Sequence, residues 1–357
     1  MDVCSPSLVQ VGSRRYRVQQ SSSPMVIESA PVMDTLLEPE EGDLDNEEED
    51  QWDPADEAAV QEEAKGVFVS RYSADCALFP ILIGRGGSAK KQMEEASGAQ
   101  IIFPPQQQSR NVVQVKGKSR AAVCKGCLRL RLAIDSALQS RLLDYNFFLS
   151  FPLANPLSVQ KFIAFRHAVT SDTAFSASGL DPSSFMTPEH LHLTIAMLKL
   201  YSDEARYRAQ MLLKKLQPQI LELLAGPLQV HLQGLEIMND DPSSIDVLYL
   251  QVHEVGPGNR LEQLCEKLVQ EFASNGLLSP QDIRPVKLHA TVINTRYAMR
   301  KAEAGAQRQQ FDGRLLLQKL SSLDLGVVTL PAVHLSQRGS FDKETGYYSS
   351  LAVMQLN

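Results

Sequence analysis

The stretch HLHLTIAML, residues 190–198, decides the fold, because a variant of it, KLHATVINT, recurs at residues 287–295. Both are apolar runs that contain the pattern Leu-His-x-Thr. In an extended strand, residues two positions apart point to the same side, so each copy presents a histidine and a threonine together. The side chains concerned are His192 and Thr194 in the first copy and His289 and Thr291 in the second. We therefore expect two strands that each carry one imidazole and one hydroxyl.

The surrounding region, residues 142–357, alternates between predicted strands and helices. Amphipathic patterns predict helices at 157–171, 202–225 and 259–276, and a basic helical stretch around 298–320. Each Leu-His-x-Thr strand follows a helix-bearing segment. Two similar halves of this kind predict a duplicated α+β domain with two lobes and a cleft between them.

A smaller domain is predicted before it, at residues 65–141. Its pattern reads strand, helix, glycine loop, helix, strand, strand, helix, with the loop Gly-Arg-Gly-Gly between the first two helices. Glycines at such a point let a sugar-phosphate chain approach the backbone closely, and nearby basic residues add charge. The residues expected to contact RNA are Gly84, Arg85, Gly86, Gly87, Lys90 and Lys91.

The charge is distributed unevenly along the chain. Residues 38–63 hold fourteen Asp and Glu and no Lys or Arg, and removing them from the formal net charge of −7 leaves +7 on the rest. We expect residues 1–64 to form a mostly disordered acidic tail. A basic body suits a nucleic-acid partner, although an acidic run is also a common solvated tail. No apolar run approaches the ~20 residues of a membrane span, and five scattered cysteines favour a reducing compartment.

Two imidazoles facing each other would form an acid–base pair, since small pKa shifts leave one neutral and the other protonated. The threonine hydroxyls would donate to a phosphate between them, and this chemistry requires no metal. A buried histidine more often satisfies a hydrogen bond in a core, and His334 in His-Leu-Ser matches the pattern a third time without its context. We expect His334 to be a structural or peripheral residue. The pair Cys124 and Cys127 is expected to pack in a helix rather than bind zinc.

These motifs resemble two known families. The region of the glycine loop resembles a KH domain, whose Gly-x-x-Gly loop clamps about four nucleotides of a single strand. The paired His-x-Thr strands resemble the 2H phosphoesterases, which implies an RNA-ligase-like fold without cofactor or metal. By that resemblance His192 and His289 are general base and acid, in an order left open.

The same resemblance assigns Thr194 and Thr291 to phosphate binding. His190 aligns with Lys287 in the other copy, and both are expected either to contact substrate or to lie exposed at strand ends. Tyr297 follows the second motif and is expected either to stack on a base or to be an ordinary tyrosine at a strand end.

The combination of the two domains resembles a subunit of a nuclear transcription coactivator assembly that contains a large helicase subunit. That resemblance implies nuclear localisation, a link to the response to DNA alkylation, and single-stranded RNA and the larger complex as partners. Two functions remain open. One is a phosphodiesterase acting on RNA ends or 2′,3′-cyclic phosphates, and the other is a non-catalytic reader of phosphate ends that serves as an adaptor.

Overall fold

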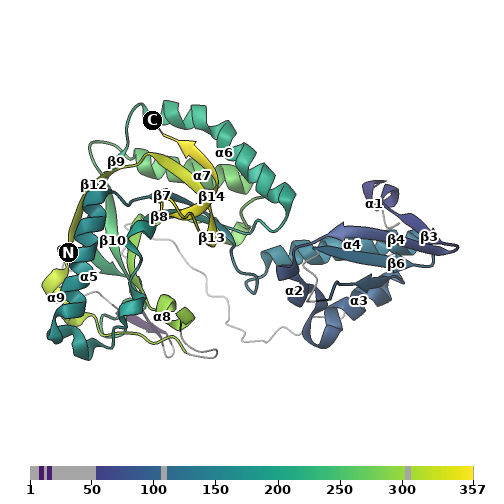
Figure 1. Cartoon of the computed structure of the whole chain (residues 1–357), viewed down its shortest axis with the longest axis horizontal. Helices are drawn as coiled ribbons and strands as arrows, with labels where there is room; N and C mark the ends of the chain where they lie inside the picture. The colour runs from purple at the N-terminus through teal and green to yellow at the C-terminus, as the bar shows by residue number, and fades with distance from the viewer. Residues whose placement is uncertain (1–7, 12–13, 18–53, 106–110, 302–306, 357) are drawn as a thin grey trace. The chain divides into compact units, whose positions relative to one another are not determined.

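The computed structural model divides the chain into two compact units, residues 1–50 and 51–357 (Figure 1). The described residues are 8–11, 14–17, 54–105, 111–301 and 307–356. In the first unit, β1 (Leu8–Val11) and β2 (Arg14–Arg17) form an antiparallel hairpin. The tail expected at residues 1–64 therefore lies largely outside the described residues.

The smaller domain of the second unit is a four-stranded antiparallel sheet in the order β3-β4-β6-β5, covered by helices. Its strands are β3 (Gln61–Ala64), β4 (Val67–Ser73), β5 (Gln100–Ile102) and β6 (Val112–Gly117), and its helices are α1 (Pro54–Ala58), α2 (Phe79–Ile83), α3 (Ser88–Ser97) and α4 (Arg120–Gln139). From β4 to α4 the order is strand, helix, helix, strand, strand, helix, as the sequence predicts.

Two elements of this domain, α1 and β3, lie before residue 65, where the sequence predicts that the domain begins. The edge strand β3 pairs with β4, with Gln61 opposite Val69. The Arg120 guanidinium donates to the carbonyl oxygens of Glu57 and Val60, both at 3.0 Å, and so ties α1 to α4. Every residue of β3 is exposed, so the strand lacks the alternation by which a strand is recognised in sequence.

Helix α4 packs its apolar face on this sheet. Val123, Cys124, Cys127 and Leu130 follow helical spacing and are almost fully buried. Burial raises the pKa of both thiols. Gly126 allows the close approach, because a Cβ there would lie 2.6 Å from Val115 Cγ1. The two cysteines are core residues, as expected.

The larger domain is built on one eight-stranded antiparallel sheet in the order β12-β9-β10-β11-β8-β7-β13-β14. Its strands are β7 (Phe147–Pro152), β8 (His192–Leu198), β9 (Gln229–Ile237), β10 (Val247–Glu254), β11 (His289–Asn294), β12 (Asp324–Thr329), β13 (Ala332–Phe341) and β14 (Tyr348–Gln355). The two histidine strands β8 and β11 are neighbours at its centre. Each begins one four-stranded half, which is the duplication expected from the sequence.

Each half is covered by a helix that follows a strand of the other half. The helices are α5 (Pro156–Ser171), α6 (Asp203–Leu224), α7 (Arg260–Ser274), α8 (Arg296–Lys301) and α9 (Arg314–Leu320). Helix α5 follows β7 but packs on β12, and α7 follows β10 but packs on β8. Helix α6 lies along β14 and contacts α7 (Figure 1). One apolar core runs through both halves, separate from the core of the smaller domain.

The prediction of a helix around residues 298–320 is wrong for the middle of this range. Helices α8 and α9 are separate, and among the described residues between them Phe311 forms an isolated bridge with Ile245. The two residues exchange backbone hydrogen bonds of 2.8 and 3.2 Å, and the Phe311 side chain is 2% exposed. Burial of this aromatic ring thus outweighs the helical tendency of its flanking residues.

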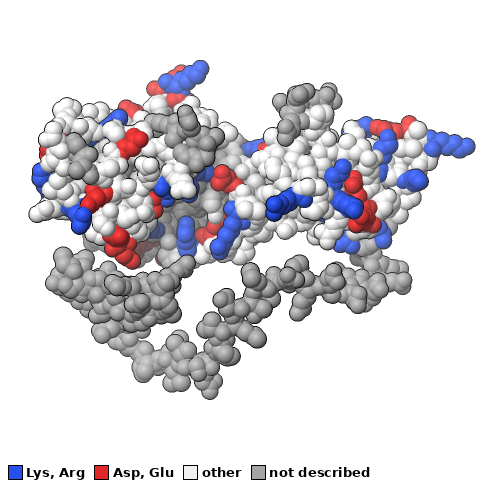
Figure 2. All heavy atoms as spheres, turned by 90° about the horizontal axis from the view of Figure 1, so that it is seen from below, with Lys and Arg blue, Asp and Glu red and all other residues white. Residues whose placement is uncertain are grey.

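Figure 2 shows basic and acidic side chains interspersed over one face of the molecule, and neither sign covers that face. No helix in the described part of the chain is long and apolar enough to cross a membrane.

Candidate active site and RNA-binding loop

The strand register brings the two Leu-His-x-Thr copies together. Ala290 of β11 lies opposite Leu193 of β8 in an antiparallel pair. The residues on either side are therefore also opposite one another, which pairs His192 with Thr291 and Thr194 with His289 on the same face. The two histidines are therefore diagonal neighbours on this face, a relation for which the usual separation is about 7–8 Å.

Both imidazoles are oriented by the same hydrogen bond. His192 Nδ1 donates to the carbonyl oxygen of His190 at 2.7 Å, and His289 Nδ1 donates to that of Lys287 at 2.7 Å. A proton held on Nδ1 leaves the lone pair on Nε2 in the neutral ring. Each histidine thus offers Nε2 as the atom that takes or gives a proton.

Burial keeps both rings neutral at pH 7. It lowers the pKa of His192 to about 4, with smaller contributions from the neighbouring His289 and His190. Burial also lowers the pKa of His289, and the ammonium of Lys287 acts in the same direction. A phosphate anion at the site would oppose both shifts, because an opposite charge nearby favours the protonated form.

A cavity of about 500 Å³ opens at this point. His192, Thr194 and Thr291 line it, whereas His289 and Lys287 do not. His289 lies opposite Thr194 across the two strands. Within the part of the chain that the structure describes, no hydrogen bond engages the hydroxyl of Thr194 or Thr291, so both are available as donors to a ligand.

An aromatic wall flanks His192. The rings of Phe148 and Tyr348 lie 5.3 and 5.4 Å from its imidazole, and their bulk accounts for its burial. Further out, His190 stacks on Phe341 with ring centres 4.3 Å apart and planes 7° from parallel. Phe341 is 48% exposed and lines the cavity. Such a wall offers flat apolar faces to a nucleobase.

The other predicted contacts are placed differently. His190 belongs to a short 3-10 turn, Pro188–His190, before β8 and lines the cavity. Lys287 places its ammonium 4.4 Å from the centre of the Tyr249 ring, away from the cavity lining. Tyr297 lies on α8 rather than at a strand end, lines the cavity and donates to Met186 Sδ at 3.6 Å.

His334 lies outside this group of residues. It sits on β13, where its Nδ1 is 2.8 Å from Ser350 Oγ and its ring meets the edge of Tyr347. It does not line the cavity. The structural role expected for His334 agrees with this placement.

Several residues of the cavity escaped the sequence analysis. Phe148, Phe341 and Tyr348 form the aromatic wall, and Arg296 and Arg338 add positive charge. Tyr348 and Phe341 lie opposite each other near the turn of the β13–β14 hairpin, far from either histidine motif in sequence. No local pattern marks them. Arg296 lies only a few residues after the second motif, so its position in the sequence could have indicated a role at the site.

The glycine loop of the smaller domain has the backbone that the sequence predicts. Gly84 adopts φ 74° and ψ 172°, a conformation essentially restricted to glycine, and a Cβ there would lie 2.8 Å from Ala89. A Cβ at Gly86 or Gly87 would meet no atom within 4 Å. Arg85, between Gly84 and Gly86, is exposed. The loop therefore presents open backbone and one cation ahead of α3.

The two lysines after the loop are partly neutralised within α3. Lys90 pairs with Glu94 at 3.6 Å and Lys91 with Glu95 at 3.5 Å, each one helical turn on. Exposed pairs of this kind are weak, about 0.3–0.5 kcal/mol. Both lysines can therefore bind a phosphate, because breaking each ion pair costs little free energy.

A metal site has no candidate in this region. Within the described ranges, no group of three or more His, Cys, Asp and Glu side chains is arranged to hold an ion.

Comparisons with known proteins agree with this architecture. A KH domain model matches residues 72–131, and a model described as AKAP7 2′5′ RNA ligase-like domain matches residues 145–356. The mouse (Mus musculus) protein activating signal cointegrator 1 complex subunit 1 is 30% identical over 367 residues, which covers 98% of this chain and 98% of that protein. These matches confirm the two domain types expected from the sequence.

Two solved structures are also similar. A phosphoesterase crystal structure is 18% identical, covers 60% of this chain and 99% of that chain, and gives a TM-score of 0.37. The crystal structure of E. coli LigT complexed with 3′-AMP is 17% identical, covers 60% of this chain and 98% of that chain, and gives a TM-score of 0.37.

Proposed function

Because the chain belongs to the AKAP7 2′5′ RNA ligase-like family and carries a KH domain, we propose that it is an RNA-binding phosphodiesterase. Its substrates would be RNA ends or 2′,3′-cyclic phosphates, and the reaction would be independent of metal. The observation that carries the proposal is the matched pair of histidines. Both hold a proton on Nδ1 and both direct Nε2 away from the backbone.

The proposed reaction divides the proton transfers between these two rings. His192 acts as the general base, because burial lowers its pKa to about 4 and keeps the ring neutral. With a cyclic phosphate, His192 Nε2 takes a proton from water as the water oxygen bonds to phosphorus. His289, protonated in the presence of the phosphate anion, gives its proton to the departing ribose oxygen. One P–O bond forms, one breaks, and the product is a phosphate monoester.

Thr194 and Thr291 would bind the reacting phosphate. Each lies across the strands from one histidine, so the two hydroxyls face the gap between the imidazoles. Their hydrogen bonds to the non-bridging oxygens would strengthen as charge develops there. The aromatic wall at Phe341 and Tyr348 would hold the base of the same nucleotide.

The KH loop would supply the affinity for a longer strand. Gly84, Arg85, Gly86 and Gly87 would clamp the sugar-phosphate chain, with Lys90 and Lys91 contributing charge. We place the two domains at residues 65–141 and 142–357, with α1 and β3 as an N-terminal addition to the first. The cyclic phosphate or RNA end would then be bound by the larger domain.

The test is an incubation with EDTA of end-labelled single-stranded RNA carrying either a 2′,3′-cyclic phosphate or a 3′-hydroxyl. The wild-type chain should process one of these ends. Variants His192→Ala and His289→Ala should each lose about 10²–10⁴-fold in rate, while His334→Ala, a histidine outside the cavity, should retain it. Turnover by both site variants, or activity that EDTA abolishes, would refute the two-histidine reaction.

A second function is favoured by the mouse relative, which is named as a complex subunit and aligns over 98% of both chains. We propose that this chain is also an adaptor in a nuclear, helicase-containing coactivator complex, in which the cavity would read a phosphate end even without turnover. Deleting residues 1–50 leaves the second compact unit complete. Pull-down with and without these residues tests whether they dock the complex, and unchanged assembly would discard that role.

A further inference from the structure

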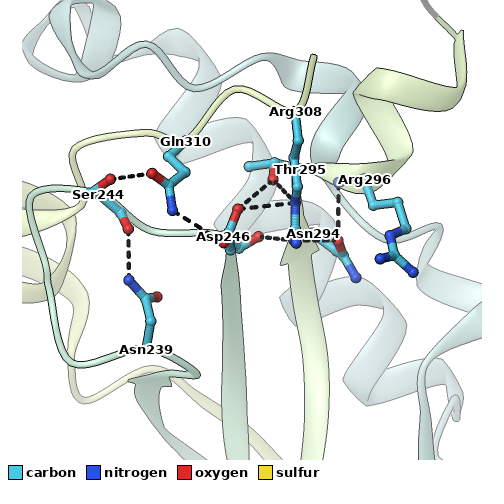
Figure 3. Close-up of polar contacts among 8 residues, drawn as sticks. All are labelled: Asn239, Ser244, Asp246, Asn294, Thr295, Arg296, Arg308 and Gln310. Atoms are coloured by element: carbon cyan, nitrogen blue, oxygen red, sulfur yellow. Dashed lines mark hydrogen bonds and ion pairs between the residues drawn. The ribbon is translucent and has the colours of Figure 1, made fainter. Parts of the chain in front are cut away.

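Arg296 is a cationic residue of the cavity that the reaction above does not use. It is the first residue of α8, directly beyond the end of β11, and it lines the cavity together with Asn294 and Thr291. Its side chain is exposed. Figure 3 shows its guanidinium pointing away from the polar network beside it. Among the described residues, no carboxylate is within ion-pair distance of this group.

The strand geometry separates the backbone of Arg296 from the threonines that would bind the reacting phosphate. Asn294 lies three positions along β11 from Thr291, and at about 3.3 Å per residue this spans about 10 Å. Arg296 follows two residues later, at the start of α8. An anion bound between the two threonines would therefore lie next to the histidines. Arg296 would instead contact a second group of the same ligand.

A partly buried polar network fixes the start of α8. Asn294 Oδ1 accepts hydrogen bonds from the backbone N–H of Arg296 at 3.0 Å and from Arg308 Nη2 at 3.1 Å. Arg308 Nε also donates to Thr295 Oγ1 at 2.8 Å, and Thr295 is 4% exposed. The guanidinium of Arg308 thus holds the two residues that lead into Arg296 (Figure 3).

The same network removes a competing negative charge. Arg308 Nε lies 2.9 Å from Asp246 Oδ1, and Gln310 donates to Asp246 Oδ2 at 3.1 Å. Asp246 is the carboxylate closest in the network to Asn294. Because Arg308 and Gln310 occupy both of its oxygens, it does not draw Arg296 into an internal ion pair.

We propose that Arg296 binds the phosphate next to the reacting one, and that Arg308 is a positioning residue acting through Asn294. The inference rests on the proposed function and narrows its substrate class. The larger domain would prefer nucleotides with at least two phosphates, such as the end of an RNA chain, over a single nucleoside phosphate. An arginine suits this role because its planar group binds two phosphate oxygens at once.

The second arginine of the cavity is a less suitable candidate for that contact. Arg338 Nη1 donates to the carbonyl oxygen of Tyr145 at 3.1 Å and lies 3.9 Å from Asp144 Oδ1. Its guanidinium is therefore already engaged by Tyr145 and Asp144. Arg314, which pairs with Asp312 away from the cavity, provides a matched control on the surface.

The experiment compares two probes that differ by one phosphate, a nucleoside 3′-monophosphate and the corresponding 3′,5′-bisphosphate. Both are too short for the four nucleotides of a KH loop. Calorimetry on the full chain should show the bisphosphate binding about tenfold or more tightly, as expected for one charged hydrogen-bonded contact. Arg296→Gln should remove that preference and leave monophosphate binding unchanged. Arg308→Ala should reduce the preference in part, Arg308→Lys should lose less, and Arg314→Gln should match the wild type.

The outcomes separate this inference from the proposed function. An unchanged bisphosphate preference in Arg296→Gln overturns the inference, as does a loss confined to Arg338→Gln. Either result leaves turnover of RNA ends to be judged by its own assay. If Arg296→Gln removes the preference while the wild type processes no RNA end, the second phosphate contact stands and the chain is a reader. Thermal unfolding of each variant separates a lost contact from a lost fold.

Discussion

Protonation of His192 should weaken the fold of the larger domain as the pH falls. The pKa of its buried imidazole is lowered to about 4, whereas an imidazole in the unfolded chain titrates near ~6.5. Between these values the unfolded chain binds the extra proton and the folded chain does not. The stabilisation is therefore complete above pH ~6.5 and is lost progressively as the pH falls toward 4.

The size of the effect follows from the pKa difference. A difference of about 2.5 pKa units corresponds to about 3 kcal/mol at full protonation, at ~1.36 kcal/mol per unit. At pH 4.5 the folded ring is still mostly neutral, and the linkage relation gives a loss of about 2–3 kcal/mol relative to pH 8. Phe148 and Tyr348, which shield the ring, are the physical source of this loss.

Urea unfolding of the wild type and of His192→Gln at pH 8 and pH 4.5 measures this term. Glutamine does not titrate, so the wild type should lose about 2–3 kcal/mol more than the variant over this interval. His167→Gln, a change at an exposed position on α5, should behave as the wild type. Equal pH dependence of wild type and His192→Gln, or an NMR titration of the His192 ring with a midpoint near ~6.5, would refute the reasoning.

Three further outcomes concern the loop and the aromatic wall. Gly84→Ala should destabilise the KH domain by about 1–3 kcal/mol, because other residues rarely adopt this backbone conformation and the added Cβ would clash with Ala89. Gly86→Ala should cost less, because its Cβ would meet no atom within 4 Å. Urea denaturation of the two variants measures the difference. Arg85→Asp should lower RNA affinity in filter binding while turnover of a small cyclic nucleotide stays unchanged, and equal loss of both would contradict the division between domains. Phe341→Ala should raise the KM for an RNA end about tenfold, as expected for a lost base-stacking contact, without changing the unfolding midpoint; an unchanged KM would exclude stacking there.

Most of the fold was predictable because its strands bury one or both faces. The motif at His192 and its copy at His289 stand in apolar runs, and both form central strands. The failures have a common physical origin in exposure and distant contacts. Strand β3 is acidic and wholly exposed, so only its pairing with β4 identifies it. Phe311 interrupts the expected helix because it bridges to Ile245, more than sixty residues away in the chain.

The site was predictable in its repeated part and not in its surroundings. The spacing of His192 and Thr194 fixes their common face without any tertiary information. The wall that sets the pKa of His192 comes from β7, the neighbour of β8, and from the β13–β14 hairpin on the far side of β7, and only the sheet order brings these strands together. Arg308 is a similar case, since its partner Asp246 lies at the start of another strand. The residues that surround the two histidines can thus be identified only once the order of the strands is known. The histidines and threonines themselves follow from the local spacing of the sequence.

The gap between the histidines is held by the helices more than by the strands that carry them. Strands β8 and β11 are joined by the pairing of Ala290 with Leu193, so backbone hydrogen bonds alone fix their spacing weakly. Helix α5 packs on β12 of the opposite half, and α7 packs on β8 of the opposite half. Parting the halves would expose apolar surface of both helices, at about 25 cal/mol for each Å². The duplication of the sequence therefore gives a pair of imidazoles on neighbouring strands, and the exchange of helices between the halves holds these strands together.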